Sequence, residues 1–316
     1  MANHSRRDRV GIGLIGLGPS WEQRYREPLL RMQNRLTIRQ VYDPVEARAK
    51  SVASEFTADV ALSLTQILCR PGVQGLLVLD PGWLGAGALQ RIASCGKQIF
   101  LARPALQQSQ SLKAILEPAP TSITIPQPSN LDQQCIPELG LRFTPSACRL
   151  RELIATRLGP VRLIQMECDL GANCAELAHL VDWCISLIAP PHKTTIRNPQ
   201  CQRAERQIAL EFPPLPFATQ IRYASLQQLP PEDRDPRFTI VCEQGTAIIA
   251  NRTQISWQTS TEGEDEFLVD ERSEIEILID QFCRRAMGGL NPVGRLSEFL
   301  RAIQIVESLD GAIGHH

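Results

Sequence analysis

"GLIGLGPSW", residues 13–21, is the stretch that decides the fold. It follows a strand-like apolar run, 9–16, and leads into a helical pattern. In that context Gly16 suits the tight turn after a first strand, and Gly18 suits the close approach of a pyrophosphate to the backbone. A third glycine usually follows in such turns, and Trp21 stands at that position. The stretch therefore predicts a dinucleotide-binding turn that departs from the usual motif at one residue.

Apolar strand-like runs alternate with helical patterns through the first part of the chain. Repeated strand–helix units give parallel strands with right-handed crossovers, so this part predicts an α/β, Rossmann-like doubly wound parallel sheet. The predicted strands are 9–16, 36–43, 58–62, 75–80 and 97–102, and the predicted helices are 20–33, 44–56, 63–70, 84–95 and 107–116.

Asp43 ends the second predicted strand, 27 residues after Gly16. A carboxylate at the tip of that strand accepts hydrogen bonds from the ribose hydroxyls of adenosine and repels a 2′-phosphate. Asp43 therefore favours NAD over NADP as the cofactor. The alternative is that Asp43 caps the helix predicted to begin at Pro44, which is a common use of Asp.

The pattern of the chain changes after residue 117, where the stretch 117–130 is rich in Pro and Ser. Later runs alternate apolar with polar residues, as in a sheet that has one wet face. We expect a dinucleotide-binding domain over 1–126, and over 127–316 an α+β domain with an open, largely antiparallel sheet whose outer face makes a homo-oligomer. The predicted strands are 161–170, 206–213, 217–226 and 238–257 with a hairpin at 243–246, and the predicted helices are 144–158, 273–287 and 296–312.

Composition restricts the class of partner. The chain has 316 residues with 33 basic and 34 acidic side chains, and this balance gives no global field to hold nucleic acid. No apolar run approaches the roughly 20 residues of a spanning helix, and no signal peptide is evident, so we expect a cytoplasmic protein without a membrane partner. The 10 cysteines are scattered and favour buried thiols over a metal site. The expected partner is a small-molecule substrate or another protein.

Seven segments, taken in order, resemble the Gfo/Idh/MocA family, which is named after glucose-fructose oxidoreductase and inositol dehydrogenase. They are "GLIGLG", "VYDP", "VQGLLVLDP", "SCGKQIFLARP", "LRFTPSACRLRELIATRLGPVRLIQM", "AHLVDW" and "PVGRLSEFLRAIQIVESL". The resemblance covers nearly the whole chain. It implies an N-terminal nicotinamide-binding domain, a C-terminal sheet domain that often forms the oligomer interface, and sugar- or polyol-type substrates.

The resemblance also implies where a cofactor and a substrate would be held. On the cofactor side it points to Gly16, Gly18, Trp21, Asp43, Pro81 and Arg103. On the catalytic side it points to His179, Asp182 and Arg103.

The chain departs from the family where its chemistry is expected. Ala102-Arg103-Pro104 stands where the family usually has Glu-Lys-Pro, Gly85 stands where a His is frequent, and Ala175 replaces an expected Asp. A lysine beside a nicotinamide can move a proton, whereas an arginine guanidinium is not deprotonated in proteins. The usual proton relay is therefore absent from these positions.

Two hypotheses follow from these departures. In the first, the chain is an oxidoreductase with altered chemistry, in which His179 is the base and Arg103 orients a sugar-like or anionic small molecule. In the second, it is a catalytically inactive pseudo-oxidoreductase that acts as a nucleotide sensor, an assembly factor or a subunit of a protein complex. His179 also has a purely structural interpretation, since it lies on one helix face with Asp182.

Overall fold

The computed structural model describes residues 9–80, 82–106, 132–168, 174–188, 195–197, 201–202, 205–211, 218–225, 237–269, 271–289 and 294–311. The chain divides into two compact units. The first unit comprises Met1–Glu138 with Arg272–Leu300, and the second comprises Leu139–Glu271 with Arg301–His316. The boundary expected at 126/127 lies outside the described residues. A division at one boundary would also place Arg272–Leu300 in the second unit, whereas these residues belong to the first.

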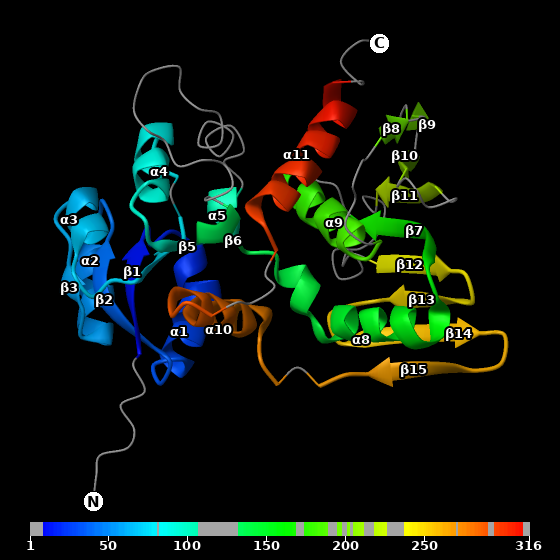
Figure 1. The fold of residues 1–316 in the computed structure, drawn as a ribbon, viewed down its shortest axis with the longest axis horizontal. Coiled ribbons are helices and arrows are strands. Elements are labelled where there is room, and N and C mark those ends of the chain that lie inside the picture. The colour runs from blue at the N-terminus through cyan, green and yellow to red at the C-terminus, as the bar shows by residue number, and fades with distance from the viewer. Residues whose placement is uncertain are drawn as a thin grey trace, which may run out of the picture. The chain divides into compact units, whose positions relative to one another are not determined.

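The first unit contains a parallel sheet with the strand order β3-β2-β1-β4-β5-β6, which confirms the predicted doubly wound sheet (Figure 1). Every residue of β1 is buried, because a central parallel strand is covered on both faces. The strands are β1 (Val10–Ile15), β2 (Leu36–Tyr42), β3 (Asp59–Val60), β4 (Gly75–Val78), β5 (Gln98–Leu101) and β6 (Cys135–Pro137).

Ile15 at the end of β1 pairs with Tyr42 of β2 and with Val78 of β4. The carboxyl ends of these strands therefore meet at one edge of the sheet, where ligands bind in doubly wound folds. The helix predicted over 20–33 begins as a π-helical turn, Trp21–Tyr25, before α1. The helix predicted over 107–116 lies outside the described residues. The helices that pack on this sheet are α1 (Arg26–Arg31), α2 (Glu46–Phe56), α3 (Leu64–Cys69), α4 (Ala86–Ala93), α5 (Arg103–Leu106) and α10 (Glu274–Ala286).

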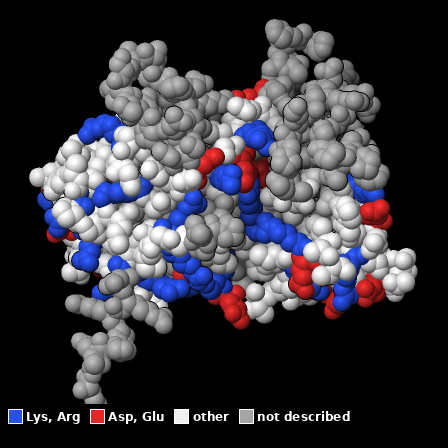
Figure 2. Space-filling view, in the orientation of Figure 1, with Lys and Arg blue, Asp and Glu red and all other residues white. Residues whose placement is uncertain are grey.

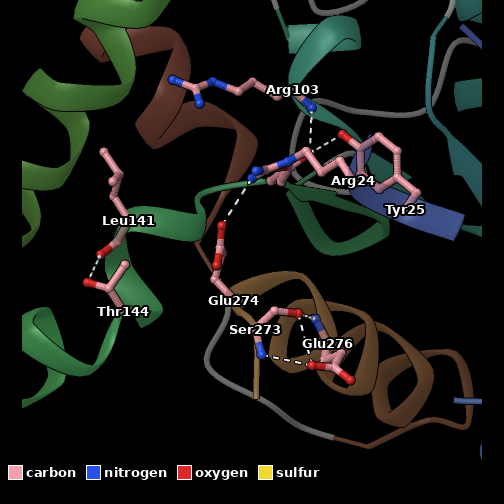
Figure 3. A network of polar contacts seen from close by, with 9 residues as sticks. Arg24, Tyr25, Arg103, Leu141, Thr144, Ser273, Glu274 and Glu276 are labelled. Carbon is pink, nitrogen blue, oxygen red and sulfur yellow. Dashed lines mark hydrogen bonds and ion pairs between the residues drawn. The ribbon is translucent and has the colours of Figure 1, made fainter. Parts of the chain in front are cut away.

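Helix α10 belongs to the first unit because its apolar face packs on the parallel sheet. The Phe282 ring lies edge-on to Phe100 of β5, with 6.1 Å between the ring centroids. A Cβ on Gly75 would come within 2.5 Å of the Phe282 ring, so this glycine gives the ring its space. Ser273 and Glu276 form a capping box that fixes where the helix begins (Figure 3).

The second unit contains an open sheet with the strand order β15-β14-β13-β12-β7-β11-β10-β8, in which β9 pairs with β10. Its pairs are antiparallel except for β7 with β11, which confirms the predicted open, largely antiparallel sheet. The strands are β7 (Val161–Cys168), β8 (Thr195–Arg197), β9 (Cys201–Gln202), β10 (Glu205–Glu211), β11 (Ala218–Ser225), β12 (Arg237–Cys242), β13 (Gly245–Ile249), β14 (Gln254–Thr259) and β15 (Gly263–Phe267).

The predicted hairpin joins β12 to β13, but the polar edge strand β15 was not predicted, because "GEDEF" has no apolar alternation. Helix α8 (Pro145–Leu153) begins at Thr144, whose hydroxyl oxygen accepts from the Ala147 amide and donates to the Leu141 carbonyl (Figure 3). Helices α8 and α9 (Cys174–Ser186) cover one face of the sheet (Figure 1). The last helix is α11 (Leu296–Gly311).

The visible surface carries acidic side chains beside basic ones, in keeping with the balanced composition (Figure 2). Among the described residues, no three His, Cys, Asp or Glu side chains gather as a metal site would. In the same part of the chain, no helix has the length and apolar character needed to span a bilayer.

Candidate functional site

The glycine turn closes between β1 and the π-helical turn that precedes α1. Gly16 has a φ of +80°, a left-handed conformation that costs glycine little, and its amide donates to the Tyr42 carbonyl at 3.0 Å. A Cβ at Gly16 would lie 2.0 Å from the carbonyl oxygen of Asp80. The turn therefore requires glycine at this position for its conformation and for its packing.

Gly18 is required by a side chain that the sequence did not indicate. A Cβ at Gly18 would lie 1.6 Å from Oδ2 of Asp80, which follows β4. The other carboxylate oxygen of Asp80 accepts from the Gly82 amide at 3.1 Å, which fixes the side chain. Both glycines of the turn thus make room for Asp80, the first for its backbone and the second for its carboxylate.

Asp43 is buried at the end of β2 and holds two backbone amides. Its Oδ2 accepts from Leu17 at 2.7 Å and its Oδ1 accepts from Val45 at 2.8 Å. These contacts tie the glycine turn to the start of α2, which begins at Glu46 and not at Pro44. A carboxylate has about four acceptor positions, and these amides occupy two of them.

The remaining cofactor-side residues have different surroundings. Trp21 is 4% exposed and packs edge-on against Phe56 of α2, with 6.0 Å between the centroids. Pro81 lies outside the described residues. Trp83 was not predicted; it is 40% exposed, and its ring lies 5.4 Å from that of Tyr42 at the end of β2. An exposed aromatic ring at this edge offers a surface on which a flat base can stack.

Arg103 adjoins a buried polar network centred on Glu138, which directly follows β6 (Figure 3). Glu138 is 1% exposed, and its Oε2 accepts from the Arg103 amide at 2.7 Å and from the Tyr25 hydroxyl at 2.6 Å. Its Oε1 accepts from Nε of Arg24 at 2.7 Å and also pairs with the Arg24 Nη2. One carboxylate thus joins the helix after the glycine turn to the ends of β5 and β6.

Interactions within this network keep the Arg24 guanidinium charged and the Tyr25 phenol neutral. Burial lowers the pKa of Arg24, but the charge and hydrogen bond of Glu138, helped by Tyr25 and Glu274, raise it by more, so the guanidinium stays charged. Burial and the adjacent Glu138 carboxylate raise the pKa of Tyr25 well above its ordinary value, so the phenol stays protonated. Glu274 adds an ion pair with Arg24 at 3.4 Å.

The Arg103 guanidinium extends away from Arg24 and Tyr25 (Figure 3). Glu138 binds the backbone amide of Arg103, so the network positions this residue without using its side-chain charge. The side chain is half-buried and carries a positive charge that it cannot release. It can therefore bind an anionic or polar group but cannot act as a general acid or base.

In the second unit, His179 and Asp182 lie on α9, 5% and 2% exposed. Asp182 forms a two-pronged ion pair with Arg142, with Oδ2 accepting from Nε at 3.0 Å and Oδ1 from Nη2 at 2.6 Å. Fork-to-fork pairing of this kind is strong and fixes both side chains. Much of the acceptor capacity of Asp182 is therefore committed to Arg142. The side chain of Ala175 is outside the described residues.

The structure brings Gly16, Gly18 and Asp43 together at one edge of the first unit, near Arg48, whose guanidinium contacts the Leu17 carbonyl at 3.4 Å. His179 and Asp182 share a helix of the second unit. The residues that the sequence did not indicate are Asp80, Trp83, Arg24, Tyr25, Glu138 and Arg142. Two of them had one signal, their place in segments that carry the family resemblance, "VQGLLVLDP" for Asp80 and "LRFTP" for Arg142.

Residues 10–123 match the sequence profile of an oxidoreductase family with an NAD-binding Rossmann fold, the Gfo/Idh/MocA family. Over these residues the chain is similar to this family. The match covers the glycine turn, Asp43, Asp80 and Arg103, so these features are variants of a known nucleotide-binding domain. No curated protein matches the chain in sequence.

Solved structures share the fold over nearly the whole chain at low identity. Levoglucosan dehydrogenase in complex with NADH and levoglucosan has a TM-score of 0.70 at 12% identity, covering 97% of each chain. Aldose-aldose oxidoreductase from Caulobacter crescentus, complexed with glycerol, has a TM-score of 0.72 at 14% identity, covering 96% of this chain and 97% of that one. UDP-N-acetylglucosamine 3-dehydrogenase from Acidithiobacillus ferrooxidans has a TM-score of 0.69 at 14% identity, with the same coverages.

Proposed function

We propose that the chain is a non-catalytic member of its family that keeps a nucleoside-binding site in the first unit but does not transfer hydride to or from neutral sugars. The observation that carries the proposal is the state of two of the three residues that the family resemblance places on the catalytic side. Arg103 stands in place of a lysine, and Asp182 is held by Arg142 at 2.6 Å. A guanidinium cannot act as a general acid or base, and the carboxylate of Asp182 is bound to a cation.

The adenosine half of NAD fits the carboxyl edge of the first unit. Asp43 retains acceptor positions for ribose hydroxyls, and its negative charge disfavours the 2′-phosphate of NADP. Trp83 offers an exposed ring within the same edge, next to Tyr42. The diphosphate half fits less well, because the Asp80 carboxylate lies against Gly18. A bound nicotinamide cofactor would supply a hydride acceptor or donor, and this chain would supply Asp43, the glycine turn and Arg103 to hold it.

Titration of the wild-type protein with adenosine, NADH and NADPH by calorimetry tests the proposed nucleoside site. We expect adenosine to bind and NADH to bind more tightly than NADPH, because a 2′-phosphate would face Asp43. Equal or tighter binding of NADPH would contradict the role of Asp43, and Arg48 would then be the residue that accepts the phosphate. Absence of adenosine binding would contradict the nucleoside site.

The second candidate function is an oxidoreductase that acts on an anionic small molecule. It is favoured by Arg103, whose contact with Glu138 uses the backbone amide and leaves the guanidinium to a ligand. His179 would be the base, since imidazole titrates near neutrality. A screen of sugar acids with NAD and NADP separates the two candidates, because the non-catalytic protein turns over none of them.

We also propose that the second unit forms a homo-oligomer through the sheet face opposite α8 and α9. Burial alternates along β12 and β13, and the register places the less buried side chains of neighbouring strands in rows, such as Gln165, Thr239 and Ile248. The row beside it contains Leu163, Val241 and Thr246. Light scattering at micromolar concentration should give a multimer of the chain mass, and a monomer would contradict the proposal.

A further inference from the structure

Asp80 occupies the place in the first unit where a dinucleotide-binding fold brings phosphate to the backbone. Its main-chain oxygen lies 2.0 Å from the position of a Cβ at Gly16, and its Oδ2 lies 1.6 Å from that of a Cβ at Gly18. The carboxylate is held there by the Gly82 amide at 3.1 Å. The space that Gly16 and Gly18 leave is thus filled by the backbone and by the carboxylate of Asp80.

Some backbone amides of the glycine turn already donate hydrogen bonds within the protein. The Leu17 amide donates to Asp43 at 2.7 Å, and the Trp21 amide donates to the Gly18 carbonyl at 3.0 Å. Pro19 has no amide hydrogen to donate. A phosphate needs several backbone donors and a positive potential to replace its hydration. At this turn it would meet fewer donors and a carboxylate.

We infer that Asp80 is a specificity-determining residue that disfavours a diphosphate over the glycine turn, so that the site takes a nucleoside in preference to a dinucleotide. The inference rests on the proposed nucleoside site. Asp80 is half-buried, so its repulsion of a phosphate a few ångströms away is only partly screened by water. The adenosine contacts of Asp43 and Trp83 do not involve this charge, so the penalty falls on the phosphates alone.

The experiment is a calorimetric titration of four proteins, the wild type and three variants, with adenosine, ADP-ribose and NADH. The variant Asp80→Asn removes the charge, keeps the shape and keeps an acceptor for the Gly82 amide. The matched control is Glu27→Gln, which removes one carboxylate from the exposed side of α1, where Glu27 and Arg31 are each 62% exposed. Thermal melting of each protein establishes that it is folded, and Asp80→Ser gives a second uncharged variant.

We expect Asp80→Asn and Asp80→Ser to bind ADP-ribose and NADH at least about tenfold more tightly than the wild type, since a like charge at this range is costly. Adenosine affinity should stay the same in all four proteins. The gain should shrink as salt is added, because added ions screen the wild-type repulsion. Glu27→Gln should match the wild type for every ligand.

The outcomes separate this inference from the proposed function. If adenosine binds and NADH binds equally to the wild type and both Asp80 variants, the role of Asp80 is overturned while the nucleoside site stands. If adenosine fails to bind but NADH tightens in the variants, the nucleoside site and the preference for a nucleoside are contradicted, and only the repulsion of phosphate by Asp80 stands. An equal gain in Glu27→Gln, or no binding of any ligand by any variant, overturns the role of Asp80.

Discussion

Each unit buries a carboxylate against an arginine, but the two pairs have different connections. In the first unit Glu138 accepts from Arg24, from the Tyr25 hydroxyl and from the Arg103 amide, and so joins three segments of the nucleotide-binding fold. In the second unit Asp182 accepts both prongs of Arg142, which lies in the turn before α8.

The two pairs act differently on the residues that the family resemblance singles out, Arg103 and Asp182. Glu138 binds the backbone amide of Arg103 and does not use the side-chain charge of that residue. Arg142 instead binds the side chain of Asp182, a residue to which the family resemblance assigns chemistry. The first pair thus binds the backbone of one predicted site residue, whereas the second binds the side chain of another.

The largest expected effect is that of Glu138→Gln on stability. The change leaves Arg24 without its main anion and places an amide group among four donor contacts, so we expect a loss of about 4 kcal/mol in the free energy of unfolding. Urea denaturation of the variant and the wild type measures this loss. A loss below about 1 kcal/mol would show that the network contributes little to the fold.

Asp182→Asn should cost about 3 kcal/mol, because Arg142 is 12% exposed and loses its charge partner while Asn retains one acceptor oxygen. A double-mutant cycle with Arg142→Met measures the coupling between the two side chains. We expect the double variant to be less destabilised than the sum of the single variants. Strict additivity would contradict the pairing.

Tyr25→Phe should cost less, about 1.5 kcal/mol, because one hydrogen bond to Glu138 is lost while the Arg24 and Arg103 contacts remain. Denaturation measures the loss. An alkaline absorbance titration gives a second readout, since the raised pKa of Tyr25 keeps it from ionising with ordinary phenols. The number of tyrosines that ionise near pH 10 should be the same in the variant and the wild type.

The smallest effect is expected at Glu266, a less buried carboxylate of the second unit. Hydrogen bonds from Arg149 lower the pKa of Glu266 most, burial opposes them, and the Trp257 indole adds to the lowering. The resulting stabilisation is present above the ordinary Glu pKa of 4.5 and is lost as the pH falls through the lowered value. Glu266→Gln should therefore cost about 1 kcal/mol at neutral pH and almost nothing in acid, as measured by denaturation across pH. A loss independent of pH would contradict this account.

Local patterns were sufficient to predict the fold of each unit. The alternation of apolar runs and helices predicted the parallel sheet, and the two-residue periodicity predicted the open sheet, because both patterns record which face of an element is buried. Helix α10 was not assigned to the first unit, since its partner Phe100 is remote in sequence. The edge strand β15 was missed because its residues are polar and exposed.

The candidate site was less predictable than the fold, because most of its contacts join residues that are far apart in the sequence. Gly16, Gly18 and Asp43 occupy positions that a short motif defines, so the sequence indicated them. Arg24 and Glu138 are 114 residues apart, and Arg142 and Asp182 are 40 apart, so only the folded chain shows that they pair. Asp80 could not be recognised as the residue that Gly18 accommodates, because that contact depends on the approach of β4 to the glycine turn.

The most direct test of the account is a turnover assay with NAD and NADP on neutral sugars, inositols and the corresponding acids. It should use the wild type, Asp80→Asn to exclude weak cofactor binding as the cause of inactivity, and Arg103→Lys combined with Ala175→Asp to restore the family residues. A general acid–base group typically raises the rate by a factor of about 10²–10⁴. Because the usual proton relay is absent, we predict turnover at background for the wild type and for Asp80→Asn. Robust turnover of a neutral polyol by the wild type would contradict the account.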